Sequence, residues 1–384
     1  MQVKHKIQLL VVALFSTMAS VSCQEDNGLN LGAMVQPVPE NYKKISADYH
    51  IWGASVIKGY DGKYHMYYSR WKYELGHMGW VTDSEIAYAV AEKAEGPYKD
   101  VNVALPARGK DFWDGTTTHN PTIFKKDGKY YLYYMGTTSP VKAKQPTSMK
   151  HKDWWLYRNN QRIGVAWSKK PEGPWNRLDY PVIDVDENPN APDALMTSNP
   201  AVNIAPNGGI FAVYKVVGKQ KDWQPIDLDK DESYQVSKGD RVRYMVSFAE
   251  NPLGPFKKHK TTIFELKEAE KEHMIAEDPY VWSQDGKYYA IVCDIQGRFT
   301  GDTGAFALMN SENGYDWHQA KHPLVLPSRI LLKDGSKTDY KLERPQLLIE
   351  EGEPSFLFGA LGITVNGIHR GHACNLRVSL KLKD

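Results

Sequence analysis

The stretch that decides the fold runs from His119 to Tyr134 and reads His-Asn-Pro-Thr-Ile-Phe-Lys-Lys-Asp-Gly-Lys-Tyr-Tyr-Leu-Tyr-Tyr. Variants of its first phrase return in four other places, which are Trp52–Val56, Ser198–Val202, Glu277–Val281 and Glu343–Leu347. The turn-and-strand phrase that follows it returns after Asp61, Asn207 and Asp285. A Gly-Pro-aromatic phrase closes three of the units, at Gly96, Gly173 and Gly254. Self-similarity at a spacing of tens of residues predicts a repeat architecture, here with five units.

Each unit is predicted to form short strands separated by turns, and no segment shows a sustained helical period. In the first unit the expected strands are Ala54–Lys58, Tyr64–Arg70, Ser84–Glu92 and Tyr98–Leu105. The chain has 384 residues, of which 41% are apolar and 12% aromatic, and this is ample for a large core. Repeated units of about four short antiparallel strands predict an all-β fold, a five-bladed β-propeller that occupies residues 45–384 as one domain.

The fifth unit ends early, because only one strand, Asn375–Leu382, follows its first two. A three-stranded last blade would leave an unpaired edge. We therefore expect part of Leu31–Lys44 to supply the missing outer strand and to close the ring. The alternative for residues 23–44 is a disordered tether, because Asn27–Val38 is rich in Gly, Asn and Pro.

The N-terminus has the features of a targeting segment. Residues 1–22 begin with a basic Lys-His-Lys and continue with the apolar stretch Leu9–Met18, which is too short to span a membrane. Ser20–Cys23 resembles the lipobox of bacterial lipoproteins, so Cys23 is the expected lipidation site. We expect an exported protein, either an outer-membrane or surface lipoprotein or a periplasmic one. The alternative is a plain secretory signal. A formal net charge of +2 gives no basic field for a nucleic-acid partner.

In a propeller the innermost strands all run in the same direction along the central channel, so equivalent positions of the five units meet on one face. Because Pro is tolerated at the first residue of a strand, the Pro phrase is expected to mark the start of each inner strand. The residues next to Pro should then ring one funnel. They are the pairs Trp52 and Gly53, His119 and Asn120, Ser198 and Asn199, Glu277 and Asp278, and Glu343 and Arg344.

Several carboxylates are expected at this funnel. Glu277 lies in the fourth phrase, and Asp48 and Asp193 stand a few residues upstream of the first and third phrases. Like charges raise one another's pKa, and a site of this kind can hold one protonated acid beside one ionised base. Cleavage of a glycosidic bond needs that pair: an acid protonates the leaving oxygen, and a carboxylate activates water or attacks directly. The alternative is that these acids cap turns or pair with Arg344.

The remaining polar and aromatic residues of the funnel are suited to a sugar. Flat apolar faces for a pyranose come from Trp52, Trp71, Trp80 and Trp113. Polar contacts come from His119, Asn120, Asn199, Asp278, Glu343 and Arg344. His369, after the second strand of the fifth unit, is a further candidate contact. For each Trp the alternative is core packing, and for the His residues it is a structural hydrogen bond.

Two insertions interrupt the repeats. Ser139–Arg162 is basic and aromatic, and Lys219–Lys238 is highly charged. Both are expected to be loops on the propeller rather than domains. The first is predicted to wall a binding cleft and to meet an anionic ligand, and the alternative is a solvated surface loop.

The inner-strand carboxylates, the Asp-Gly-Lys-Tyr-Tyr turns and the Gly-Pro-aromatic closures resemble the five-bladed glycoside hydrolases of families 43 and 117. This resemblance implies Asp48 as the catalytic base, Asp193 as the residue that orients or tunes the acid, and Glu277 as the catalytic Glu. The chain departs from family 43 at Gly53, where that family usually has its first Asp. It departs from family 117 at Ala276, where that family has a His, so we expect a relative outside both.

The resulting prediction is an exo-acting glycoside hydrolase that releases a terminal sugar from plant or algal oligosaccharides with inversion. His119 and Glu343 are alternatives for the general acid. We expect no cofactor and no catalytic metal. A second interpretation is a phosphorylase of the mannoside type, with phosphate bound by Arg344, Arg370 and His372. A third is a surface glycan-binding lipoprotein without catalysis, which needs the Trp faces and no carboxylates.

Overall fold

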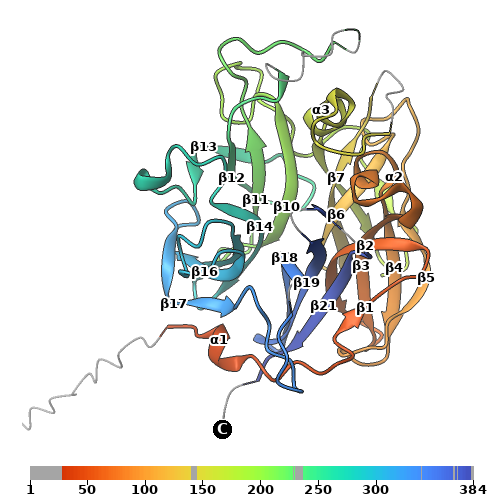
Figure 1. Ribbon diagram of the computed structural model, residues 1–384, viewed down its shortest axis with the longest axis vertical. Coiled ribbons are helices and arrows are strands. Elements are labelled where there is room, and N and C mark those ends of the chain that lie inside the picture. The colour runs from red at the N-terminus through yellow and green to blue at the C-terminus, as the bar shows by residue number, and fades with distance from the viewer. Residues whose placement is uncertain are drawn as a thin grey trace, which may run out of the picture.

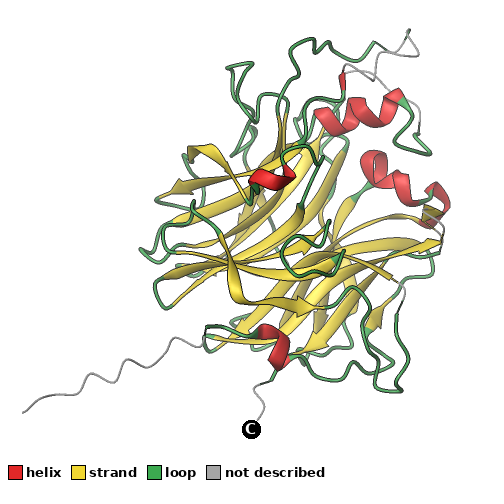
Figure 2. Cartoon of the chain, turned by 60° about the vertical axis from the view of Figure 1, so that its left-hand side comes forward, coloured by secondary structure: helices red, strands yellow, loops and turns green. Residues whose placement is uncertain are grey.

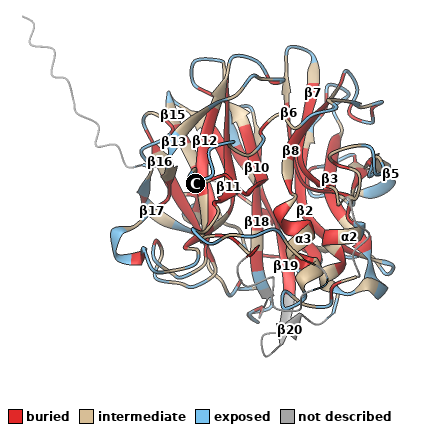
Figure 3. Ribbon diagram, turned by 90° about the horizontal axis from the view of Figure 1, so that it is seen from above, coloured by how far each residue is buried: buried red, intermediate tan, exposed pale blue. Residues whose placement is uncertain are grey.

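The chain folds into a five-bladed β-propeller, as the repeats predicted (Figure 1). The computed structural model describes residues 28–139, 145–227, 229, 237–338, 340–365, 368–369 and 371–381. Seen from above, the sheets stand around a common centre and their inner strands are buried (Figure 3). Strands make up most of the regular structure, and the helices are few and short (Figure 2).

Each blade is an antiparallel sheet whose strands follow one another from the centre outwards. Blade one holds β2 (Tyr49–Lys58), β3 (Tyr64–Lys72), β4 (Glu85–Ala91) and β5 (Lys99–Leu105). Blade two holds β6 (Thr117–Lys126), β7 (Lys129–Thr137), β8 (Arg162–Ser168) and β9 (Asn176–Arg177). Blade three holds β10 (Met196–Ile204), β11 (Ile210–Val217), β12 (Val242–Ala249) and β13 (Lys257–Ile263).

The last two blades repeat this order. Blade four holds β14 (Ala276–Gln284), β15 (Lys287–Asp294), β16 (Ala305–Ser311) and β17 (His318–Leu326). Blade five holds β18 (Tyr340–Glu350), β19 (Glu353–Val365), β21 (Cys374–Ser379) and β1 (Lys43–Lys44), with β20 (Ile368–His369) paired to β19. The α-helices are α1 (Leu31–Met34), α2 (Trp80–Asp83) and α3 (Lys152–Asn159), and 3-10 turns span Tyr73–Leu75, His77–Gly79 and Lys267–Ala269.

The recurrent Pro phrase is a β-bulge inside each inner strand. The expectation that it marks the strand start was wrong, because the inner strands begin three or more residues before the Pro position of the phrase. In blade two the register with β7 shifts between His119 and Thr122, and the other four inner strands shift at the equivalent place. The second residue of each phrase has a positive φ: Gly53 63°, Asn120 51°, Asn199 48°, Asp278 49° and Arg344 52°. Gly, Asn and Asp tolerate this conformation best, which explains why they recur there.

The N-terminal segment closes the ring, as predicted. Lys43 and Lys44 of β1 pair with Leu376 and Asn375 of β21 and complete the fifth blade. Upstream of β1, the segment packs against blades four and five through four buried side chains, which are Leu31, Met34, Val38 and Tyr42. Burial of such side chains stabilises the closure by about 1.5–3 kcal/mol each.

Neighbouring blades are joined by tyrosine hydroxyls as well as by apolar packing. Tyr67 of blade one donates a hydrogen bond to the carbonyl oxygen of Pro171 in blade two, at 2.5 Å, and Tyr133 of blade two donates to Pro252 of blade three. Each acceptor lies just before a Gly-Pro-aromatic phrase, at Gly173 or Gly254. The repeated Tyr and the repeated closing phrase are therefore two halves of one contact between blades.

The helices mark the two ends of the propeller. In Figure 1, α2 and α3 stand at one end and α1 lies at the opposite end. Helix α3 belongs to the insertion between β7 and β8, and the second insertion joins β11 to β12. Within the described ranges, no helix combines the length and apolar character that crossing a bilayer requires.

Candidate active site

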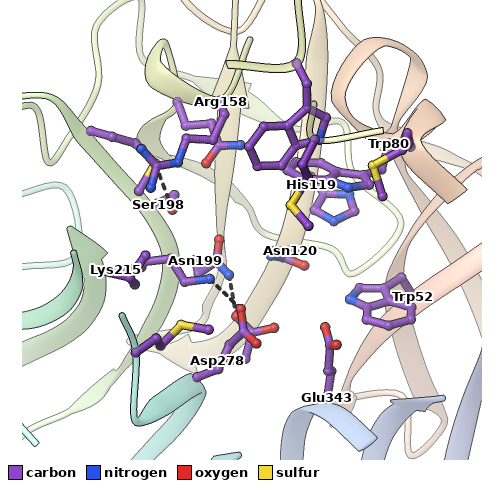
Figure 4. A pocket seen from close by; sticks show the side chains of 18 of the residues that line it. Trp52, Trp80, His119, Asn120, Arg158, Ser198, Asn199, Lys215, Asp278 and Glu343 are labelled. Carbon is purple, nitrogen blue, oxygen red and sulfur yellow. Dashed lines mark hydrogen bonds and ion pairs between the residues drawn. The ribbon is translucent and has the colours of Figure 1, made fainter. Parts of the chain in front are cut away.

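The five inner strands surround a cavity of about 350 Å³ at the end of the channel that carries α2 and α3. Every blade contributes to its wall through the bulged phrase (Figure 4). The contributing residues are Trp52, His119, Asn120, Ser198, Asn199, Glu277, Asp278 and Glu343. The structure therefore brings together eight residues from distant parts of the chain, and Trp71 of β3 joins them.

Two of the predicted catalytic residues lie elsewhere. Asp48 is exposed, directly before β2, and is absent from the cavity wall. A strand advances about 3.3 Å per residue, so the four residues from Asp48 to Trp52 carry its carboxylate about 13 Å along the strand. Asp193 is buried, but its Oδ2 accepts a bond of 2.6 Å from Lys258 on the outermost strand of blade three. This ion pair ties Asp193 to the edge of blade three, and neither Asp lines the cavity.

Two predicted contacts are also placed away from the cavity. Trp113 stacks on Tyr134 with ring centroids 5.6 Å apart and presses against Gly164, so it packs inside blade two. Arg344 is fully buried and donates to the carbonyl oxygen of Pro121 at 3.3 Å, inside the channel rather than in the cavity wall. The side chain of His369 lies outside the described part of the structure, as does the whole of Cys23.

Two glutamates in the cavity each have a lysine partner. Glu277 Oε1 accepts a bond of 2.8 Å from Lys215, and Glu343 Oε1 is paired with Lys341. Both carboxylates are largely buried, with 15% and 14% of their side chains exposed. Lys215 is itself only 13% exposed, whereas Lys341 is 43% exposed, so the ammonium group of Lys341 is better solvated.

The two carboxyl groups have pKa shifts of opposite sign. Burial raises the pKa of Glu343, the charges of Glu277 and Asp278 raise it further, and Lys341 opposes them only in part, which gives a pKa of about 7. Burial also raises the pKa of Glu277, but the charges of Lys215 and Lys341 and the bond from Lys215 outweigh it, and the pKa is lowered. The cavity therefore holds an ionised Glu277 beside a Glu343 that keeps its proton to a much higher pH.

The other polar groups are fixed by short contacts. Asp278 accepts a hydrogen bond from the side-chain amide of Asn199 (Figure 4) and donates its backbone N–H to the Tyr244 hydroxyl at 2.9 Å. His119 Nδ1 lies 2.6 Å from the Ser84 hydroxyl. Burial and the charges of Arg344 and His77 hold the pKa of His119 well below its usual range. His119 is therefore neutral near pH 7 and can orient a ligand, but it is a poor proton donor.

Aromatic side chains form the side of the cavity that adjoins α2 and α3. Trp52 and Trp71 come from blade one, while Trp80, Trp154 and Trp155 come from the two helices. Trp80 stacks on the His119 ring at a centroid distance of 5.0 Å, and Trp154 meets Trp80 edge to face. The first insertion thus walls the cavity, as the sequence predicted.

The sequence analysis missed four titratable groups in the cavity wall, which are His77, Lys215, His273 and Lys341. The sequence carried a signal for Lys215, which is the only charged residue in the apolar run of β11. In the structure Lys215 pairs with Ser198 of the inner strand. Lys341 lies two residues before Glu343, and alternation along a strand puts both on one face. Among the described residues, no three His, Cys, Asp or Glu side chains gather to hold a metal ion.

A five-bladed propeller with carboxylates and tryptophans at one end of its channel has the fold of glycoside hydrolases of families 43 and 117. Zg3597, a family 117 glycoside hydrolase from the marine bacterium Zobellia galactanivorans, is similar with a TM-score of 0.60 and 17% identity over 90% of this chain and 89% of that chain. The endo-arabinase of Bacteroides thetaiotaomicron VPI-5482 has a TM-score of 0.54 and 12% identity over 90% and 99%. At these sequence identities the similarity shows a shared fold alone.

A sequence match covers a smaller part of the chain. The extracellular endo-alpha-(1->5)-L-arabinanase 2 of Bacillus subtilis (strain 168) is 30% identical over an alignment of 129 residues, and the match covers 30% of this chain and 25% of that protein. The chain thus spans a quarter of the length of the curated relative it matches. No protein-family model matches the chain.

Proposed function

We propose that the chain is an exo-acting, inverting glycoside hydrolase in which Glu343 is the general acid and Glu277 the general base. One observation carries this proposal: two carboxyl groups in one cavity have pKa values shifted in opposite directions. Environments that separate the pKa values of two acids are how a glycosidase obtains its acid and its base. This replaces the assignment of Asp48 as base and Glu277 as acid, because Asp48 lies outside the cavity wall.

The reaction follows from these two roles. The Glu343 carboxyl gives its proton to the glycosidic oxygen as the bond from that oxygen to the anomeric carbon breaks. Glu277 takes a proton from a water molecule whose oxygen bonds to the anomeric carbon from the opposite face. Glu343 ends ionised and Glu277 protonated, and exchange with solvent restores both. Lys215 keeps Glu277 ionised before the reaction, and Lys341 stabilises the charge that develops on Glu343.

The size and lining of the cavity support an exo mode and a sugar ligand. A volume of about 350 Å³ is at the small end of ligand pockets, and this favours one terminal sugar over an internal stretch of polymer. The tryptophans of blade one, α2 and α3 provide the apolar faces. A plant or algal source is supported by similar proteins named as arabinanases and by a family 117 hydrolase from a marine bacterium.

The test is an oligosaccharide panel with and without phosphate, with the anomers of the products read by NMR. We expect release of a terminal sugar without phosphate and with inverted configuration, and its loss in Glu277→Gln and Glu343→Gln. Asp48→Asn is the matched control and should keep turnover within twofold. Equal turnover in all four proteins would refute the roles, retained configuration would refute inversion, and strict phosphate dependence would establish the phosphorylase interpretation. Binding without cleavage would favour the glycan-binding interpretation.

Export and lipid anchoring at Cys23 stay part of the proposal, because residues 1–27 lie outside the described structure. The support is the basic start, the short apolar stretch and the lipobox-like Ser20–Cys23. Metabolic labelling with a fatty acid should mark the wild-type chain and leave Cys23→Ser unlabelled. Equal labelling of both would refute the anchor.

A further inference from the structure

Arg158 is a cation in the cavity wall that no carboxylate of the described residues contacts. Lys215 is paired with Glu277 and Lys341 with Glu343. Arg158 of α3 also lines the cavity, and among the described residues no carboxylate pairs with it. It is only 6% exposed, although Arg is almost never fully buried unless it is paired. An unpaired buried guanidinium in a ligand cavity points to an anion that the ligand supplies.

The described residues around Arg158 hold its side chain in place but accept hydrogen bonds from only one of its three nitrogens. Nη1 donates to the carbonyl oxygen of Lys238 at 3.1 Å and to Asn159 Oδ1 at 3.2 Å. In the described part of the chain, Nε and Nη2 have no acceptor. Asn159 also donates to the carbonyl oxygen of Ser237 at 2.7 Å, so α3 is tied to the end of the second insertion. The guanidinium group lies 5.3 Å from the ring centroid of Trp155.

The charge of Arg158 persists at neutral pH. Burial lowers the pKa of Arg158 to about 10, so the side chain is still protonated at pH 7. A buried charge without a counter-ion is costly, and an Arg fork that meets a carboxylate or a sulfate recovers this cost through charge-assisted hydrogen bonds. Glu277 and Glu343 are held by Lys215 and Lys341, so these two acids offer Arg158 no substitute partner.

The position of Arg158 also suits an anion that must stay clear of the catalytic acids. In Figure 4 Arg158 lies across the cavity from Asp278 and Glu343. A negative substituent near Glu343 would raise the pKa of that group further and would be repelled by Glu277. On the opposite wall it would meet the positive charge of Arg158 and the ring faces of the α3 tryptophans.

We propose that Arg158 binds a negatively charged substituent, a carboxylate or a sulfate ester, on the terminal sugar that enters the cavity. That the bound sugar is a substrate rests on the proposed hydrolase function, whereas the binding of its anionic group does not. The preferred substrates would then be acidic oligosaccharides that end in a uronic acid or a sulfated sugar. Arg158 is a specificity-determining residue in this proposal and takes no part in proton transfer.

The experiment compares charged and neutral sugars that differ in one group. Glucuronate, galacturonate and galactose 6-sulfate are titrated into the full chain beside glucose and galactose, with wild type, Arg158→Met, Arg158→Lys and Lys150→Met. Lys150 is the matched control, because it lies in the same insertion and is exposed outside the cavity wall. Thermal melts show whether each variant is folded.

We expect at least one charged sugar to bind wild type about 10- to 100-fold more tightly than its neutral partner, which is the usual contribution of a charge-assisted hydrogen bond. Arg158→Met should abolish this preference and leave the affinity for neutral sugars unchanged, Arg158→Lys should retain part of it, and Lys150→Met all of it. Preference for the uronates alone assigns a carboxylate, and preference for the sulfate ester alone assigns that group.

Equal binding of charged and neutral sugars by wild type would overturn the inference, as would equal effects of the Arg158→Met and Lys150→Met substitutions. These outcomes differ from failure of the hydrolase proposal. Arg158-dependent binding of an acidic sugar without cleavage of any oligosaccharide would refute the hydrolase and keep the anion site. Cleavage of acidic oligosaccharides at equal rates by wild type and Arg158→Met would keep the hydrolase and refute the anion site.

Discussion

The substitution Glu343→Gln tests the proposed acid through two quantities that should change in opposite directions. Gln keeps the size of the side chain and cannot give a proton, so turnover should fall by about 10²–10⁴-fold. At the same time the folded protein should gain stability at alkaline pH, because Gln removes a carboxylate that the fold resists ionising. If Glu343 had a merely structural role, its substitution would lower activity and stability together.

The size of the stability change follows from the pKa. A folded-state pKa raised from 4.5 to about 7 means that Glu343 stabilises the native state below pH 4.5 and that this contribution is lost as pH rises through 7. The loss is about 3 kcal/mol. At 2.1 cal/mol/K per residue, a propeller of about 340 residues unfolds with an entropy of about 0.7 kcal/mol/K. The Tm of Glu343→Gln should therefore rise relative to wild type by about 4 °C between pH 4 and pH 8.

The assay is a pair of thermal melts across pH 4–8 with turnover of an oligosaccharide and of a nitrophenyl glycoside. An acidic phenol leaves without protonation, so its release should suffer much less in Glu343→Gln than cleavage of the natural bond. Glu277→Gln is the matched control with the opposite sign, because the pKa of Glu277 is lowered and its ionised form stabilises the fold. A Tm difference that is flat with pH, or equal losses on both substrates, would refute the assignment of Glu343 as the acid.

Four further predictions follow from the same structure. The pH profile of kcat/KM should be bell-shaped. Its alkaline limb should lie near pH 7, from the raised pKa of Glu343, and its acid limb below pH 4.5, from the lowered pKa of Glu277. A flat profile would contradict both assignments. Lys215→Met should raise the pKa of Glu277 and move the acid limb to higher pH, and an unmoved limb in a pH–rate measurement would contradict the ion pair. Asp48→Asn should leave both kcat/KM and Tm unchanged, since that carboxylate is exposed. Tyr42→Ala should destabilise the ring closure by about 3–5 kcal/mol in denaturant unfolding, and a cost under 1 kcal/mol would show that the N-terminal segment does not close the ring.

Local sequence signals were sufficient to predict the propeller. Five copies of one phrase, four of them with Pro, and the Asp-Gly turns give the number of blades. The short fifth unit required the N-terminal segment that β1 supplies. These features depend on contacts within a unit or between neighbouring units, which repeat and so can be seen. The same repeats predicted that Trp52, His119, Glu277 and Glu343 share one cavity, because equivalent positions must ring the channel.

The chemistry within that ring was not predictable in the same way. Asp48 and Glu343 are both acids near a recurrent phrase, yet the strand start leaves Asp48 in solvent while the bulge turns Glu343 into the cavity. The pKa of Glu343 depends on burial and on Glu277 and Asp278 of another blade, and that of Glu277 on Lys215 of a third. The sequence by itself determined which positions encircle the channel, because a repeat obeys local rules. Only the tertiary structure decided which carboxyl keeps its proton, because desolvation and Coulomb energy depend on distances between groups far apart in the chain.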